Sequence, residues 1–445
     1  MADILDTSGA GHTGGSSRDA DDQHVSPSDI AVGVVIGRAS EFFDFFVFAI
    51  ASVIVFPARI FPFVDPLEGT LWSFVLVALA FVARPVGTAL FMAFDRRYGR
   101  VTKLTLALFL LGTSTVAMGL VPSYETAGWW SIAILAGLRI GQGLALGGAW
   151  DGLAPLLAIT ASKERRGFFA MVPQLGAPIG LAVASILFAY LVTTLSAADF
   201  LDWGWRYPFF VAFAINVVAL FARLRIIATP EFRHLFETNE LKPSRIRDTV
   251  AQDGRTLLLG IFVPLASFAM FHMVTVFPLS WIFLYTDVTL GSFLMTEALG
   301  AALGTLSMLF SGWLSDRIGR RKILVWGAWA IGVYAVVAPT LLGAGRLGES
   351  GYVLIGFVIL GFSFAQSSGA VASLFDQRNR YTGSAFVSAL SWMFGAGFAP
   401  LTALLLSSWF GLPAAGIYLL SGAICTTLSL SVARQIALHP REGDR

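Results

Sequence analysis

Long apolar runs alternate with short polar or glycine- and proline-rich turns along most of the chain. A helix needs about 20 apolar residues to cross a bilayer core about 30 Å thick, and the longer runs approach or exceed that length. The predicted spans are 29–55, 70–94, 102–122, 129–157, 168–194, 207–226, 256–285, 291–314, 323–343, 351–375, 382–408 and 411–433. The pattern therefore predicts an all-α membrane protein with twelve transmembrane helices.

The composition supports this prediction and excludes several classes of protein. The 445 residues are 56% hydrophobic and 13% charged, whereas about 25% of the residues in a soluble domain are charged. A net charge of +2 is too small to indicate nucleic-acid binding, and one cysteine, Cys425, cannot form a disulfide within the chain. No nucleotide-binding, hydrolase or metal-ligand motif is present. We therefore expect no enzyme activity, no catalytic residues, no cofactor and no bound metal.

The basic residues of the loops indicate how the chain is oriented. Most of them lie in five alternate connections, namely 95–103, 162–166, 227–255, 316–322 and 376–380. The intervening connections hold only Arg59, Arg206 and Arg346. Because lysine and arginine are enriched in cytoplasmic loops, we expect a multi-pass protein of the cell membrane with both termini in the cytoplasm.

The longest charged connection separates two equal sets of spans. We predict a disordered cytoplasmic tail over 1–28, a six-helix half over 29–226, a cytoplasmic linker over 227–255, a second six-helix half over 256–433 and a cytoplasmic tail over 434–445. The loops DRRYGR (95–100) and DRIGRR (316–321) occupy matching places in the two halves. Such an internal repeat is typical of a duplicated six-helix unit.

Several stretches resemble the major facilitator superfamily, and within it the metabolite:proton symporter group of shikimate, ketoglutarate, citrate and proline/betaine carriers. They are SGWLSDRIGRRK (311–322), RIGQGLALGG (139–148), SEFFDFF (40–46), and WGWRYPFF (203–210) followed by RLRIIATPEFR (223–233). The resemblance implies two pseudo-symmetric halves that transport a small metabolite by alternating access. Three positions depart from the family pattern: Met92 takes the glycine place of the first loop, Arg96 takes its acidic place, and Ala149 replaces the glutamate of the fourth helix.

The first span holds Arg38, Glu41 and Asp44, although an ionised group at the bilayer centre costs about 3 kcal/mol or more. Such groups persist where they pair or face a watery cavity. At about 1.5 Å per residue, Glu41 and Arg139 lie at nearly the same depth, so an ion pair between them is possible. Either carboxyl could carry a proton, while Arg139 keeps its charge. The alternative is a static link between helices.

Candidate roles follow from these positions and from the resemblance. The proton-coupling candidates are Glu41, Asp44 and Arg139. The substrate-binding candidates are Arg38, Glu41, Arg139, Gln142, His272 and Glu297. The gating candidates are Arg84, Asp95, Arg97, Gly99, Arg100, Gly312, Asp316, Arg317, Gly319, Arg320 and Arg321, of which the loop residues also anchor the cytoplasmic side. Asp151 could pair with Arg84 or with a loop arginine.

The residues and the resemblance together predict a proton-coupled symporter that imports a small organic acid or zwitterion. Its partners would be the lipid bilayer, the substrate and protons, without nucleic acid, and it would function as a monomer. One alternative is a proton-driven exporter of a drug or metabolite, which the direction of the pH dependence distinguishes from a symporter. Another is a sensor derived from a transporter, which would bind a ligand without counterflow. The sequence does not identify the substrate.

Overall fold

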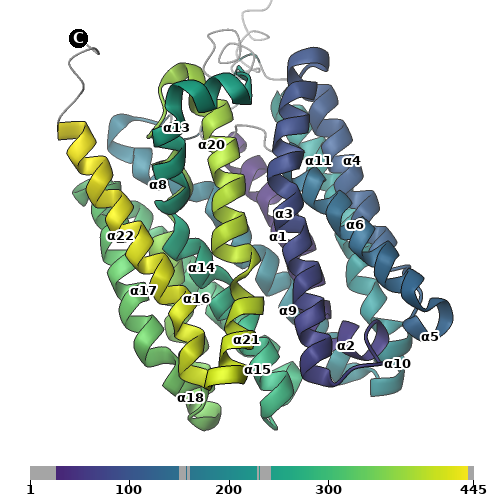
Figure 1. Ribbon diagram of the computed structural model, residues 1–445. Coiled ribbons are helices and arrows are strands. Elements are labelled where there is room, and N and C mark those ends of the chain that lie inside the picture. Colours follow the sequence, from purple (N-terminus) through teal and green to yellow (C-terminus); the bar gives the residue numbers. More distant parts are fainter. Residues whose placement is uncertain (1–26, 150–156, 158–160, 228–229, 231–241, 439–445) are drawn as a thin grey trace, which may run out of the picture.

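Figure 1 shows the computed structural model of the protein, which describes residues 27–149, 157, 161–227, 230 and 242–438. These residues form helices and short connections, and no strand occurs among them. Eleven of their helical stretches are long and apolar enough to cross a membrane. Helix α1 (Pro27–Ile54) is a twelfth, set apart by the charged residues Arg38, Glu41 and Asp44. The predicted all-α fold with twelve spans is therefore confirmed.

The first half consists of six spans with short helices at their ends. The spans are α1, α3 (Pro66–Tyr98), α4 (Arg100–Met118), α6 (Trp129–Gly148), α8 (Arg166–Met171) continued by α9 (Gly176–Thr194), and α11 (Tyr207–Ile227). Short helices α2 (Phe56–Arg59), α5 (Tyr124–Ala127) and α10 (Ala197–Asp202) lie in the connections.

The second half repeats this plan with more interrupted helices. The spans are α13 (Ile246–Phe262) continued by α14 (Leu265–Thr275) and α15 (Phe277–Tyr285), then α16 (Leu290–Ile318), α17 (Arg320–Leu342), α18 (Gly345–Phe364) with α19 (Ser367–Ala372), α20 (Gln377–Trp392) with α21 (Ala399–Phe410), and α22 (Gly416–Leu438). Pro264 and Pro278 lie at the two breaks of the first span, as expected for a residue that cannot donate a helical hydrogen bond.

Glycine ends one helix and begins the next at the matching loop of each half. Gly99 has φ +83° between α3 and α4, and Gly319 has φ +90° between α16 and α17. A side chain at such a φ is strained, so glycine allows both sharp turns. These loops lie on one face of the molecule, at the top of Figure 1, which we call the basic face. The face that carries Asp65, Trp203 and Gly345 is the opposite face.

Small residues bring the helices of the first half into backbone contact. A Cβ atom on Gly143 would lie 2.3 Å from the Ala80 carbonyl oxygen, and one on Gly147 would lie 2.4 Å from the Arg84 carbonyl oxygen. Helices α3 and α6 can therefore approach closely only because these positions lack side chains. This contact fixes the position of Arg84 on α3 relative to Arg139 on α6.

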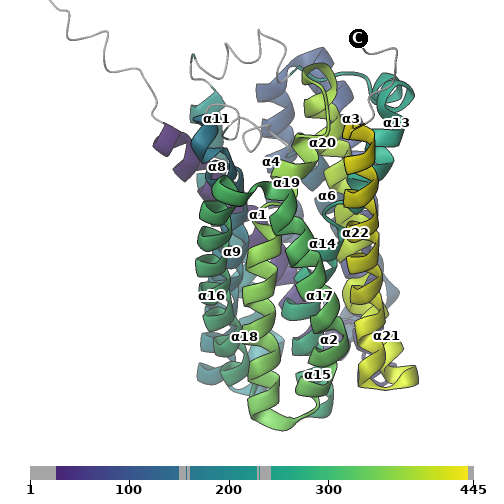
Figure 2. The same ribbon diagram turned by 90° about the vertical axis from the view of Figure 1, so that its left-hand side faces the viewer.

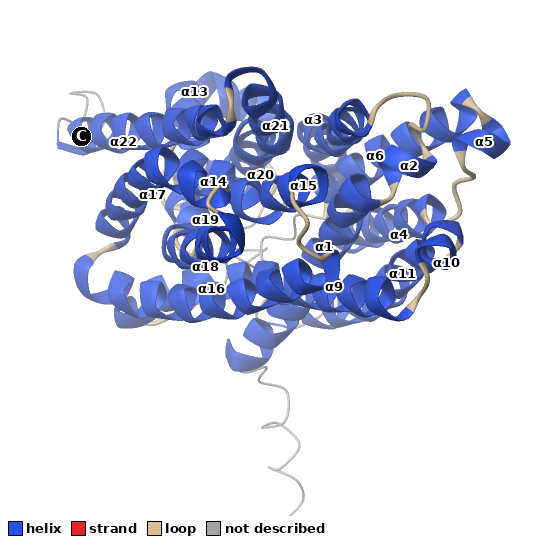
Figure 3. Ribbon diagram, turned by 90° about the horizontal axis from the view of Figure 1, so that it is seen from below, coloured by secondary structure: helices blue, strands red, loops and turns tan. Residues whose placement is uncertain are grey.

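The two halves meet along α9 and α16, which lie side by side when the molecule is seen from the opposite face (Figure 3). In the view of Figure 2, α16 and α9 also overlap along their length. Aromatic rings fill the middle of the interface, where Phe42 and Phe46 of α1 lie against Phe271 of α14 with ring centroids 5.6 and 5.5 Å apart. Trp392 of α20 stacks on Phe81 of α3.

Candidate functional site

A small cavity lined by charged and aromatic side chains lies beside α1 at the interface between the halves. Its volume is about 30 Å³, and it is lined by Arg38, Glu41, Phe42, Phe45, Phe81, Arg84, Leu146 and Trp392. A cavity of that size holds a water molecule or two, whereas metabolite pockets measure about 300 Å³ or more. The space between these charged residues is therefore too small here for a metabolite.

Glu41 is held by two arginines. Arg38 Nη1 donates to Oε2 at 2.5 Å, and Arg223 Nη2 of α11 donates to Oε1 at 2.5 Å. A Cβ atom on Gly37 would lie 2.4 Å from Arg223 Nε, so this glycine leaves room for the guanidinium group. Two cations in contact with one carboxylate favour its charged form against the cost of its burial.

The ion pair between Glu41 and Arg139 that depth alone allowed is not formed. Two side chains at equal depth meet only if their helices also turn them toward each other. Arg139 instead points to a part of α1 beyond Glu41. Its guanidinium carbon lies 4.0 Å from the centre of the Phe48 ring. Arg139 donates to Gln142 and to the Leu76 carbonyl, the latter at 3.3 Å.

Asp44 is buried among uncharged donors. Asn216 Nδ2 of α11 donates to Oδ2 at 2.5 Å, and the Thr115 hydroxyl of α4 donates to the same oxygen at 3.1 Å. The other oxygen, Oδ1, has no hydrogen-bond partner. Gln142 donates to Thr115 at 2.9 Å, so a chain of hydrogen bonds connects Arg139 to Asp44 without an ion pair between them.

Arg84, which the sequence suggested for the gate, lines the central cavity. Its guanidinium carbon lies 5.8 Å from the centre of the Trp392 ring, and it joins Arg38 on the wall beside Glu41. Helix α3 runs from Pro66 to Tyr98 and leaves Arg84 well inside the span, away from the loop. Asp151, its suggested partner, lies outside the described residues.

His272 and Glu297 are the buried ionisable side chains that α14 and α16 contribute. The His272 ring lies 4.9 Å from the Phe45 ring between centroids, and neither ring nitrogen has a hydrogen-bond partner. Glu297 accepts one hydrogen bond, from the Ser185 hydroxyl at 3.3 Å. Neither residue lines the cavity beside α1.

The loop of the second half crosses to the first half. Asp316 accepts backbone hydrogen bonds from Gly167 at 2.6 Å and Phe168 at 3.2 Å. Gly312 packs against Phe168, because a Cβ atom on Gly312 would lie 3.4 Å from the Phe168 Cα atom. The basic residues of this loop contact their own half: Arg317 lies over Trp313, Arg320 donates to Gly369, and Arg321 donates to Leu430.

The loop of the first half crosses to the second half through a tyrosine. Asp95 is buried with Lys103 at 3.4 Å and Arg100 at 3.6 Å. Tyr381 of α20 donates its hydroxyl to Asp95 at 3.3 Å and accepts from Lys103 at 2.9 Å. Arg97 lies over the neighbouring Tyr98 ring. The two loops therefore each reach across the interface at the basic face.

Four residues of the site escaped the analysis of the sequence: Lys103, Asn216, Arg223 and Tyr381. An arginine and an asparagine inside the sixth apolar span could have indicated Arg223 and Asn216, because buried polar residues in a membrane need partners. Nothing in the sequence distinguishes Tyr381 from other tyrosines.

A model of the major facilitator superfamily matches residues 34–386. The chain belongs to this superfamily. It is 35% identical over 416 residues to the inner membrane metabolite transport protein YhjE of Escherichia coli (strain K12), a match that covers 92% of this chain and 94% of that protein. The shikimate transporter of the same organism is 28% identical over 409 residues, covering 90% of this chain and 92% of that protein.

The solved structures give the same fold. The crystal structure of a D-xylose-proton symporter matches with a TM-score of 0.69 and 16% identity, covering 94% of this chain and 98% of that one.

A putative proline/betaine transporter of Staphylococcus aureus (strain MSSA476) is 29% identical over 422 residues, covering 90% of this chain and 88% of that protein. The superfamily member described here is therefore a multi-pass membrane transporter of a small metabolite, not an enzyme, as the sequence predicted.

Proposed function

We propose that this transporter is a proton-coupled symporter that imports a small organic acid or zwitterion, with its basic face in the cytoplasm. The relatives named above include a shikimate transporter and a putative proline/betaine transporter. The observation that carries the proposal is the contrast between two carboxyls on α1. Glu41 has two arginine partners, whereas Asp44 has only uncharged donors.

Asp44 is the proton carrier in this proposal. A buried carboxylate without a cation in contact costs several kcal/mol, so the closed site favours a neutral Asp44 and a hydrated site favours an ionised one. Arg139 stays charged throughout the cycle and acts on Asp44 through Gln142 and Thr115. Glu41 is not suited to carry the proton, because two arginines hold its charge.

The substrate would bind where Arg38 and Arg84 line the cavity. Three guanidinium groups, those of Arg38, Arg84 and Arg223, surround the single carboxylate of Glu41. This excess of positive charge suits a substrate carboxylate, which could form ion pairs with Arg38 and Arg84. Phe81 and Trp392 offer apolar surface for the rest of the molecule.

Alternating access would proceed by rocking of the halves 29–226 and 256–433, joined by the linker 227–255. The contacts of Asp316 with α8 and of Asp95 with Tyr381 close the basic face in the present state. Both would break when this face opens. Because each joins one half to the other, they are suited to gate the cytoplasmic side.

The decisive experiment separates exchange from proton-driven accumulation in proteoliposomes. A panel of organic acids and betaines is screened first by counterflow with the wild type. Asp44→Asn should retain counterflow and lose accumulation driven by an inward proton gradient, since it keeps the hydrogen bonds but cannot release a proton. Asp202→Asn, on the exposed α10, is the matched control and should accumulate substrate normally.

Other outcomes would overturn the proposal in defined ways. An Asp44→Asn variant that still concentrates substrate under a pH gradient rules out Asp44 as the proton carrier. Loss of substrate from loaded vesicles as protons enter indicates an exporter. Binding of substrate without counterflow in the wild type indicates a sensor.

A further inference from the structure

A second carboxyl lies at the contact between the two halves, far along the sequence from α1. Glu297 of α16 is completely buried, and the Ser185 hydroxyl of α9 donates to its Oε2 at 3.3 Å. Its other oxygen, Oε1, has no partner. Since α9 belongs to the first half and α16 to the second, this bond joins the halves directly.

Among the residues that the structure describes, no cation forms an ion pair with this carboxyl. The ionisable side chains toward this end of α9, α15 and α18 are Tyr190, Tyr285, Arg346, Glu349 and Tyr352, and none of them forms a hydrogen bond or ion pair with Glu297. A buried ionised carboxylate with one neutral donor is strongly unfavourable. The packing observed here therefore accommodates the neutral acid.

The shorter path from this carboxyl to water leads to the opposite face. Helix α16 begins there at Leu290, so Glu297 lies about 10 Å inside. Nearer the surface the two helices touch, because a Cβ atom on Gly291 would lie 2.6 Å from Thr193 Cγ2. Solvent can enter from this face if α9 and α16 separate at this end.

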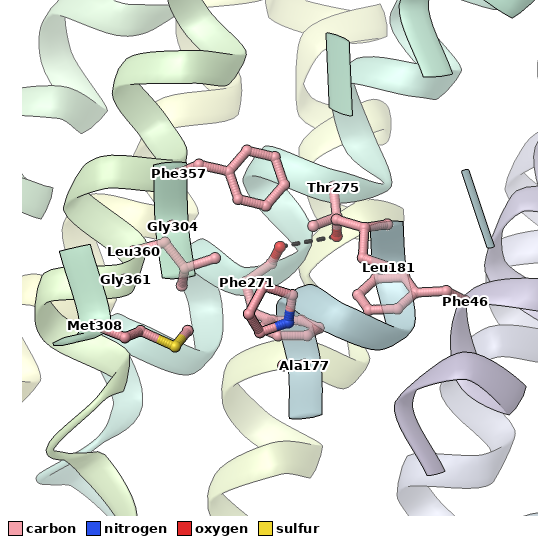
Figure 4. A pocket seen from close by; sticks show the side chains of 11 residues that line it. Phe46, Ala177, Leu181, Phe271, Thr275, Gly304, Met308, Phe357, Leu360 and Gly361 are labelled. Atoms are coloured by element: carbon pink, nitrogen blue, oxygen red, sulfur yellow. Dashed lines mark hydrogen bonds between the residues drawn. The ribbon is translucent and has the colours of Figure 1, made fainter. Parts of the chain in front are cut away.

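Toward the middle of the membrane the interface becomes apolar. Figure 4 shows the pocket lined by Phe46, Leu181, Phe271, Met308 and Phe357, in which the one hydroxyl, that of Thr275, donates to the Phe271 carbonyl. These side chains offer no chain of hydrogen bonds from Glu297 to Asp44. The two carboxyls would therefore exchange protons independently.

We propose that Glu297 is a second proton-binding residue of the transport cycle, which rests on the proton-coupled function proposed above. When α9 and α16 separate, a hydronium ion from the opposite face transfers its proton to the Glu297 carboxylate and leaves as water. The neutral acid then accepts the Ser185 hydrogen bond and the helices close. When the basic face opens instead, the carboxyl gives its proton to a water molecule on that side, which leaves as hydronium, so the proton has crossed the membrane.

Disulfide formation between α9 and α16 measures this closure. Cys425 is the only cysteine, so Cys425→Ser gives a background for Thr193→Cys and Gly291→Cys. The Cβ atoms of these positions lie within about 4 Å of each other, a separation suited to a disulfide. The rate of cross-linking is measured across a pH series in otherwise wild-type protein and in Glu297→Gln.

The cross-linking rate of the protein with Glu297 is divided by that of Glu297→Gln at each pH. This ratio removes the pH dependence of the thiols, which is the same in both proteins. It should fall by up to about tenfold per pH unit as the carboxyl ionises, because one proton is then lost on opening. In the Glu297→Gln variant the contact between α9 and α16 should stay closed at every pH. Equal pH profiles in the two proteins would overturn the inference. Ser185→Ala should lower the cross-linking rate and keep the pH dependence.

Two further measurements separate this inference from the proposed function. Adding Asp44→Asn to the cysteine pair should leave the pH profile of cross-linking intact, because the two carboxyls act independently. In unmodified protein, a proton gradient of one pH unit at zero membrane potential should drive about 100-fold accumulation with two protons per substrate and about tenfold with one. Tenfold accumulation overturns the role of Glu297 alone, whereas no accumulation overturns proton coupling.

Discussion

The interiors of the two six-helix halves differ far more than their folds. In the first half, α1 and α11 bring Glu41 together with Arg223, and α1, α4 and α11 surround Asp44 with donors. In the second half, His272 and Glu297 are equally buried and make no ion pair. A repeated fold therefore does not repeat its chemistry: the first half carries the fixed charges, and the second supplies rings and neutral groups that face them.

The loops at the basic face differ in a second way. Each half sends an aspartate across the interface, but Asp316 binds backbone amides of Gly167 and Phe168, whereas Asp95 binds the side chain of Tyr381. A backbone amide donor remains when the side chain of its residue is substituted. The hydroxyl of a tyrosine is lost by one substitution. The two gates are therefore suited to respond differently to mutation.

The largest expected effect comes from breaking the charge pair of the first half. Arg223→Ala leaves Glu41 with only Arg38, which is partly exposed, and removal of one partner of a buried ion pair costs about 3–5 kcal/mol. The midpoint of thermal unfolding in detergent should fall strongly. Adding Glu41→Gln should restore part of the loss, because the unpaired charge is then removed.

A matched control uses an ion pair at the surface. Asp202 lies 3.7 Å from Arg59 and its side chain is 77% exposed, so Asp202→Asn should leave the unfolding midpoint almost unchanged. An Arg223→Ala protein as stable as this control would show that the Glu41 pair does not support the first half.

A smaller effect is expected at the gates. Asp316→Asn should favour opening of the basic face, since hydrogen bonds to a charged group contribute about 1.5–3 kcal/mol. Opening is measured as the rate of maleimide labelling of Ala170→Cys, a position buried at this contact, in a Cys425→Ser background. Tyr381→Phe should accelerate labelling less, because it removes one hydroxyl and leaves Asp95 paired with Lys103.

The opposite order of labelling rates would contradict the comparison of the two gates. If Tyr381→Phe accelerates labelling more than Asp316→Asn, the tyrosine rather than the backbone contact holds the basic face closed. The intrinsic reactivity of the new cysteine is controlled by labelling the same protein after unfolding.

Local patterns allowed the spans and the loop glycines to be predicted. Hydrophobic runs define a span by its own residues, and the shared turn at Gly99 and Gly319 follows from matching sequences. The partners of buried charges were not predictable in the same way. Depth along a helix follows from residue number, but rotation and tilt decide that Glu41 meets Arg223 instead of Arg139.

The same limit applies to Arg84 and Tyr381. The sequence places Arg84 inside its span, but only the packing of α3 against α6 shows that it lines the cavity. Tyr381 acts on Asp95 from a span nearly three hundred positions away. Contacts between the two halves depend on how the halves pack against each other. Local sequence patterns do not predict that packing.

The smallest effect on stability is expected at His272, in the second half. Its ring nitrogens have no partner and its neighbours are the rings of Phe45, Phe81 and Phe271. His272→Phe removes two unpaired polar atoms and keeps an aromatic ring, so the unfolding midpoint without substrate should stay the same or rise.

Transport should respond differently from stability at this position. We propose that the free nitrogens of His272 bind substrate in the loaded state, and His272→Phe should then raise KM for uptake while counterflow persists. A lowered unfolding midpoint would reveal a structural partner for the ring, and an unchanged KM would remove His272 from the substrate site. The second result would leave His272 with a structural role and would assign recognition of the substrate carboxylate to the arginines of the first half.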